Sequence, residues 1–121
     1  MERSALLGLL GKRNLRISLR EIFQKAGYTI VDITPDPEEM IKYVRTRDYD
    51  RYLMYLNLGS SNSPDITPAI SVYELIRKRV ESGEAKFVGI SGNNDAVKSA
   101  KERGIPAFPS LVYFSLDEFI V

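Results

Sequence analysis

The spacing of apolar residues changes repeatedly along the chain, and each change marks the boundary of a predicted helix or strand. Residues 3–10 are mostly apolar and, with Gly8 and Gly11 in or beside them, fit either a short helix or a strand. An amphipathic helix is predicted over residues 13–26, with Gly27 as its natural end. Its apolar positions recur at helical spacing: Leu15, Leu19, Ile22, Phe23 and Ala26.

The middle of the chain alternates between strand and helix patterns. Residues 29–34 have the composition of a strand. The run Asp36-Pro37-Glu38-Glu39 predicts a helix start, with an aspartate N-cap, a proline at the first position and acids in the first turn. Residues 51–58 are almost continuously apolar or aromatic, as in a central strand buried on both faces. A polar segment then leads into a helix that ends at Gly83, and residues 87–91 predict another strand.

The last predicted helix begins after Asn93, a suitable N-cap, and ends at Gly104. Pro109 stands before residues 110–115, which have strand composition, and residues 119–121 fit a hairpin partner. Proline donates no ladder hydrogen bond, so Pro109 belongs at a strand's first position, where a cis bond is a candidate. The alternating elements predict an α/β sheet covered by helices, with an antiparallel final pair because its connection is too short for a helix.

Composition narrows the function classes. The 121 residues are 44% hydrophobic and 27% charged, which fits one compact domain. The net charge of +1 argues against a polyanion as the main partner. Residues 1–27 are nevertheless basic, and although such a helix face is usually just solvated, nucleic-acid binding remains a minor option. The apolar run Ala5 to Leu10 is too short to span a membrane and poor as a secretory signal, so we expect a cytoplasmic protein.

The chain contains no cysteine and no histidine. This removes thiol redox chemistry, disulfides, Cys/His metal sites and imidazole catalysis. The adjacent carboxylates, such as Glu38 and Glu39, lie at predicted helix starts or turns, where capping and solvation explain them. We therefore predict no catalytic residue, no metal site and no cofactor.

Residues 104–114, with the sequence GIPAFPSLVYF, resemble the thioredoxin-like family, in which a helix ends at glycine and a cis-proline precedes an apolar strand. Pro109 takes the place of that cis-proline. The central strand and the Ser63–Pro68 spacing extend the resemblance over residues 29–121. It implies a thioredoxin-like mixed sheet flanked by helices, with a helical N-terminal extension (1–27) packed on the domain (28–121). The chain departs from the family pattern in one respect: we expect the final C-terminal helix of a typical member to be absent.

The resemblance also implies a redox-inactive member, because the two cysteines of the family motif fall on Ser60 and Ser63. The family's buried carboxylate falls on Met54 and the tryptophan before its first cysteine on Gly59. Thiol–disulfide exchange needs a sulfur nucleophile, which serine does not provide.

The expected function is a protein-binding or assembly module that pairs an extended peptide in a groove. The groove residues are Gly59, Ser60, Ser61, Asn62, Ser63, Phe108 and Pro109. A protein or peptide is the predicted partner. A homodimer is a further option, because without a final helix one apolar sheet face needs a cover.

Two other functions stay open. In a glutathione-transferase-like enzyme, Ser60 or Ser63 at a helix N-terminus would stabilise a bound thiolate, although no general base is evident. A receiver-like signalling domain is the main rival fold. There Tyr55 replaces the phosphoacceptor aspartate, and Leu10-Gly11-Lys12 stands where the acidic pocket should be. Such a domain would not be phosphorylated.

Overall fold

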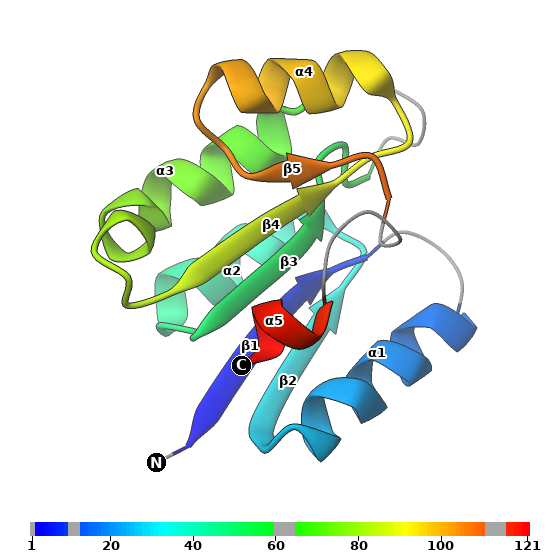
Figure 1. Cartoon of the computed structure of the whole chain (residues 1–121), viewed down its shortest axis with the longest axis vertical. Coiled ribbons are helices and arrows are strands. Elements are labelled where there is room, and N and C mark those ends of the chain that lie inside the picture. The colour runs from blue at the N-terminus through cyan, green and yellow to red at the C-terminus, as the bar shows by residue number, and fades with distance from the viewer. Residues whose placement is uncertain (1, 10–12, 60–64, 111–115) are drawn as a thin grey trace.

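The structure is a computed structural model that describes residues 2–9, 13–59, 65–110 and 116–121. Strands and helices alternate along the chain (Figure 1). In order they are β1 Arg3–Gly8, α1 Arg13–Lys25, β2 Tyr28–Thr34, α2 Pro37–Thr46, β3 Arg51–Tyr55, α3 Thr67–Glu81, β4 Lys86–Ile90, α4 Asn94–Glu102, β5 Ala107–Phe108 and α5 Leu116–Ile120.

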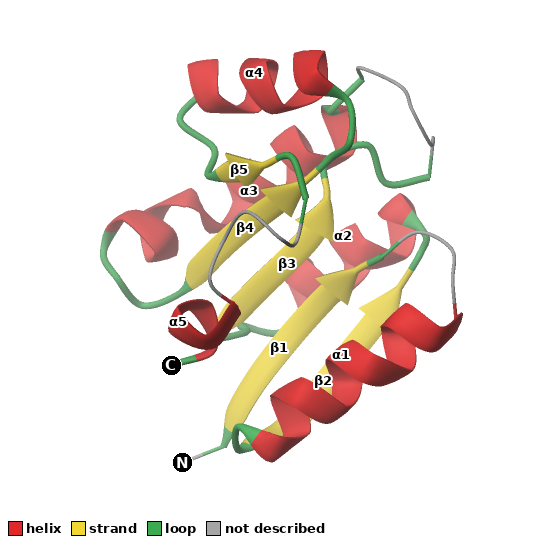
Figure 2. Ribbon diagram, turned by 45° about the vertical axis from the view of Figure 1, so that its right-hand side comes forward, coloured by secondary structure: helices red, strands yellow, loops and turns green. Residues whose placement is uncertain are grey.

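The five strands form one sheet in the order β2-β1-β3-β4-β5, and every pair is parallel. Helices cover both faces (Figure 2). On one face, α1 and α5 bury Leu19, Phe23, Phe119 and Ile120 against the sheet. On the other face, α2, α3 and α4 pack over a second apolar cluster, which includes Met40, Tyr73 and Val97. The molecule is therefore a three-layer α/β domain.

The first strand corrects the prediction of a helical N-terminal extension. Residues 3–8 form β1, which lies between β2 and β3 near the middle of the sheet. Ala5, Leu6 and Leu7 are fully buried, because alternate side chains enter the two apolar layers. The segment that follows, α1, belongs to the helical layer beside β2 (Figure 1).

The C-terminal elements correct three more predictions. The sheet is wholly parallel rather than mixed, since β5 runs parallel to β4. The peptide bonds of the described residues are all trans, so Pro109 is not a cis-proline, and it follows the short strand β5 instead of preceding one. Residues 111–115 of the strand predicted at 110–115 lie outside the described residues.

The final helix predicted to be absent is present as α5, where a hairpin strand was expected. Two arginines from neighbouring strands donate to its last carbonyl groups. Arg3 Nη2 lies 2.6 Å from the Ile120 oxygen, and Arg51 Nε lies 2.6 Å from the Phe119 oxygen. Cationic donors at the carboxyl end of a helix satisfy carbonyls that have no partner within it.

Three predicted helix boundaries are confirmed, whereas the strand predicted at 51–58 ends at Tyr55. Gly27, just past α1, has a φ of +98°, a left-handed conformation that glycine adopts without strain. Asp36 caps α2, with its Oδ1 accepting from the Glu38 amide at 3.1 Å. Asn93 caps α4 by accepting from the amides of Asp95 and Ala96.

Candidate functional site

The carboxyl edge of the sheet is the expected ligand site, because open α/β sheets bind ligands where the strand order reverses. In this sheet the reversal lies between β1 and β3. β1 ends at Gly8 and β3 ends at Tyr55, so these strand ends border the crevice expected from the topology. Tyr55 is half-buried.

Apolar residues lie at these two strand ends. Leu9 is fully buried and donates its amide to the Thr34 carbonyl at 3.0 Å. A Cβ added to Gly8 would lie 3.0 Å from the Met54 Cβ and 3.1 Å from Leu58 Cδ2. The end of β1 thus packs directly against residues at and beyond the end of β3.

The polar side chains at this edge already serve the backbone. Ser91, which follows β4, is buried, and its hydroxyl accepts from the Asn93 amide at 3.0 Å. Thr34 Oγ1 accepts from the Asp36 amide at 3.1 Å, while Asp36 itself caps α2. These bonds shape the loops at the carboxyl edge and explain the polar residues without a ligand.

The predicted groove falls partly at the same edge. Gly59 follows the end of β3, and Phe108 with Pro109 ends β5, while β4 separates the two strands. Ser60, Ser61, Asn62 and Ser63 lie outside the described residues, so the peptide groove stays a prediction. Gly59 has a φ of +87°, and a Cβ there would approach Pro37 Cδ to 2.9 Å, so a larger residue would not fit without strain.

One concave surface does include Pro109. It is a cavity of about 460 Å³ beside α4, and its lining is Asn94, Val97, Lys98, Lys101, Glu102 and Pro109. The two lysines are exposed, whereas Val97 is nearly buried at 7% exposure. Sequence analysis did not connect α4 with Pro109, because their proximity depends on the parallel pairing of β4 with β5.

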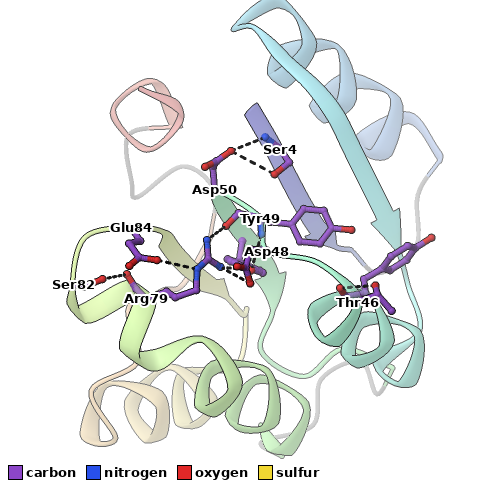
Figure 3. Close-up of polar contacts among 10 residues, drawn as sticks. Ser4, Thr46, Asp48, Tyr49, Asp50, Arg79, Ser82 and Glu84 are labelled. Carbon is purple, nitrogen blue, oxygen red and sulfur yellow. Dashed lines mark hydrogen bonds and ion pairs between the residues drawn. The ribbon is translucent and has the colours of Figure 1, made fainter. Parts of the chain in front are cut away.

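A separate polar network occupies the opposite, amino edge of the sheet (Figure 3). Arg79 at the end of α3 donates to the Tyr49 carbonyl, and Asp50 accepts from the Ser4 amide at 2.8 Å. Tyr49 donates to Asp32 Oδ2 at 2.5 Å. Burial, and then that hydrogen bond, raise the pKa of Tyr49 well above its usual value, so its phenol stays protonated. The network ties the loops at this edge together.

No protein-family model matches the sequence, and no curated protein matches it. Among solved structures, the chain is similar to the receiver domain of a sensor histidine kinase from Pseudomonas aeruginosa PAO1. The two share 17% sequence identity at a TM-score of 0.56, over 99% of this chain and 98% of the other. The fold is receiver-like.

This similarity overturns the thioredoxin-like assignment, together with its redox-inactive and cis-proline features. The receiver-like sheet is parallel throughout, with the strand order seen here. The glutathione-transferase alternative depended on the thioredoxin-like fold and falls with it. Of the described helices, none is both long and apolar enough to cross a membrane.

The structurally similar receiver domain of the sensor histidine kinase holds a magnesium ion in its active-site cleft. The residues of this chain do not fit such an ion. No cluster of three acidic side chains occurs within the described ranges, and Leu9 and Tyr55 occupy the ends of the two strands beside the crevice. Leu10, Gly11 and Lys12 add no carboxylate either, because their side chains contain none. Magnesium is held by carboxylate and other oxygen ligands, which Leu9 and Tyr55 do not supply.

Proposed function

We propose that this chain is a receiver-like signalling domain that accepts no phosphoryl group and acts by binding a protein partner. The observation that carries the proposal is Tyr55 at the end of β3, beside the fully buried Leu9. Formation of an acyl phosphate needs a carboxylate nucleophile, and a phenol does not supply one. Among the described residues, no group of acidic side chains offers a site for the metal that phosphoryl transfer uses.

The surface proposed for the partner is the cavity between α4 and Pro109. It is concave, has an apolar floor at Val97 and carries the exposed cations Lys98 and Lys101 at its rim. An apolar centre with a charged rim is the usual anatomy of a protein interface. Of the predicted groove residues, Pro109 lines this cavity and is retained in the proposal.

The first test concerns phosphoryl chemistry. The protein is incubated with radiolabelled acetyl phosphate and magnesium, and the label that survives denaturation is counted. We expect no incorporation, and no shift of the Tyr55 or Ser91 amide resonances when magnesium and beryllofluoride are added. Incorporation that hydroxylamine removes would reveal an acyl phosphate and refute the proposal.

The second test concerns the partner. A photo-crosslinking amino acid is introduced at Lys101, and in a control protein at Ser82, which is exposed at the far end of α3. After irradiation in the native cell, we expect a discrete adduct from position 101 and none from position 82. Adducts of equal yield from both positions, or none from either, would contradict binding at the α4 surface.

The homodimer remains a prediction, but its original reason is gone. It rested on an uncovered sheet face, and α5 packs Phe119 and Ile120 onto that face. Any self-association must therefore use another surface.

A further inference from the structure

We propose that the groove between α1 and the outer edge of β2 binds an acidic peptide segment in extended conformation. The peptide adds to the sheet beside β2, places carboxylates against the arginines of α1 and inserts one apolar side chain between them. This surface is separate from the α4 cavity, so the inference goes beyond the function proposed above.

The groove has a volume of about 320 Å³ and combines positive charge with apolar contact. Its lining is Arg13, Arg16, Ile17 and Arg20 of α1 and Ile33 of β2. The helical residues are spaced three, four and seven apart and therefore share one face. Ile17 is 45% exposed, so its apolar side chain is open to contact between the arginines. Arg16 Nε is buried without a hydrogen-bond partner, so one guanidinium donor remains unsatisfied.

The backbone of β2 offers the second half of the site. β2 is the terminal strand of the sheet order, and within the described ranges no strand pairs with its outer side. Leu9 donates to the Thr34 carbonyl, so the carbonyls of alternate residues point toward β1. Those of Val31 and Ile33 consequently point outward, where an added strand would meet them.

Arg20 shows that α1 overhangs this edge. Its Nη1 donates to the outward Val31 carbonyl at 2.8 Å. A free strand edge attracts another chain unless it is covered, and here a single arginine supplies the cover for one carbonyl. Figure 2 shows α1 running alongside β2 at the margin of the sheet. The arginine row and the backbone edge thus border one groove.

The spacing of the groove matches an extended acidic peptide. Along α1, Ile17 lies between Arg13 and Arg20, at axial separations of about 6 Å and 4.5 Å from a rise of about 1.5 Å per residue. Alternate side chains of a strand are about 6.8 Å apart on one face. A peptide with an acid, an apolar residue and an acid at alternate positions therefore brings its two carboxylates near Arg13 and Arg20 and its apolar side chain near Ile17. Flexible arginine side chains cover the remaining difference, and guanidinium pairs strongly with carboxylate.

Charge argues for this occupant over two others. A second copy pairing antiparallel through β2 would set the two arginine rows side by side on one face, where like charges repel. A nucleic acid is favoured by a broad positive field and aromatic stacking, whereas the net charge is +1 and none of the described residues that line the groove is aromatic. The carboxylate of β2, Asp32, does not neutralise the row, because it accepts from Tyr49.

The test uses a fluorescein-labelled peptide of sequence TETVTET and its uncharged counterpart TQTVTQT. Fluorescence anisotropy measures binding to the full chain, to the R13Q/R16Q variant and to the control variant R45Q/K78Q. Arg45 and Lys78 are exposed, lie on α2 and α3, and match the charge removed. We expect both the uncharged peptide and R13Q/R16Q to weaken binding by about tenfold or more, and the control to bind like the parent chain. Hydrogen exchange then reports strand addition through slowed exchange of the Val31 and Ile33 amides.

Several results would overturn the inference. No binding at millimolar peptide, equal affinity for the two peptides, or binding without protection of the Val31 and Ile33 amides would each do so. Tighter binding of a single-stranded oligonucleotide, lost in R13Q/R16Q, would assign the groove to nucleic acid. Dimerisation lost in R13Q/R16Q would assign it to a second copy. None of these results bears on phosphoryl transfer at Tyr55 or on crosslinking at Lys101, so the two proposals fail separately.

Discussion

Replacing Arg79 with methionine tests which contacts stabilise the amino edge of the sheet (Figure 3). Arg79 Nη1 donates to the Tyr52 hydroxyl at 2.8 Å and Nη2 to the Tyr49 carbonyl at 2.9 Å. Its side chain is only 22% exposed. Arg79 Nη1 also lies 3.7 Å from Asp48 Oδ1, and Arg79 Nε lies 3.4 Å from Glu84 Oε2. The side chains of these two acids are 79% and 66% exposed.

The magnitude follows from treating these contacts separately. A hydrogen bond from a charged donor contributes about 1.5–3 kcal/mol, and partial exposure of Arg79 places both bonds toward the lower value. The two ion pairs together contribute about 0–1 kcal/mol, because their carboxylates are solvated. The Glu84 contact at 3.4 Å also lacks hydrogen-bond geometry. Methionine retains most of the apolar stem, so R79M should lower the free energy of unfolding by about 2–4 kcal/mol.

Urea unfolding followed by circular dichroism measures this change, with an unaltered m-value as the sign that only stability has moved. The control is D48N/E84Q, which removes both carboxylates and keeps the two hydrogen bonds. D48N/E84Q should lower the free energy of unfolding by less than about 1 kcal/mol, and high salt should abolish this difference by screening the ion pairs. The reasoning is refuted if R79M costs less than about 1 kcal/mol, or if D48N/E84Q costs as much as R79M.

Two further predictions follow from the interior. Gly89→Ala should lower the free energy of unfolding, measured in urea, by about 1–3 kcal/mol. The new methyl group would overlap the buried Leu56 side chain. An unchanged free energy of unfolding would mean that Leu56 moves aside. Burial raises the pKa of four phenols above the value near 10 that they have in the unfolded chain. Their contribution to the free energy of unfolding is therefore fully present below about pH 10 and is lost as the pH rises through the folded pKa values. The four are Tyr28, Tyr49, Tyr52 and Tyr73. Near-ultraviolet phenolate absorbance and circular dichroism should therefore change together, and ionisation of all seven tyrosines near pH 10 with the fold intact would contradict this.

Helix boundaries were predictable because their causes are local. Asp36 and Asn93 each satisfy amides two or three residues away, and Gly27 supplies the backbone conformation at the very point where α1 ends. Such contacts are encoded within one turn of chain, so the residue pattern suffices. The order of the strands has no comparable local cause.

The first strand shows the limit most clearly. Leu6 enters one apolar layer and Leu7 the other, so β1 is apolar on both faces and shows no alternation. Periodicity cannot separate such a run from a buried helix. Its position beside β2 and β3 depends on contacts with residues more than 20 positions away, as in the Arg3–Tyr28 hydrogen bond.

The placement of β1 also decides where the candidate site lies. In the thioredoxin-like interpretation the first strand was missing, and the site was assigned to the polar loop after Leu58. Once β1 lies between β2 and β3, the strand order reverses beside it, and the crevice moves to Leu9 and Tyr55. The side chains at these two positions then decide the chemistry, because neither leucine nor tyrosine can form an acyl phosphate. An error in one buried strand therefore displaces the site, which is why the receiver-like alternative identified Tyr55 while the favoured fold did not.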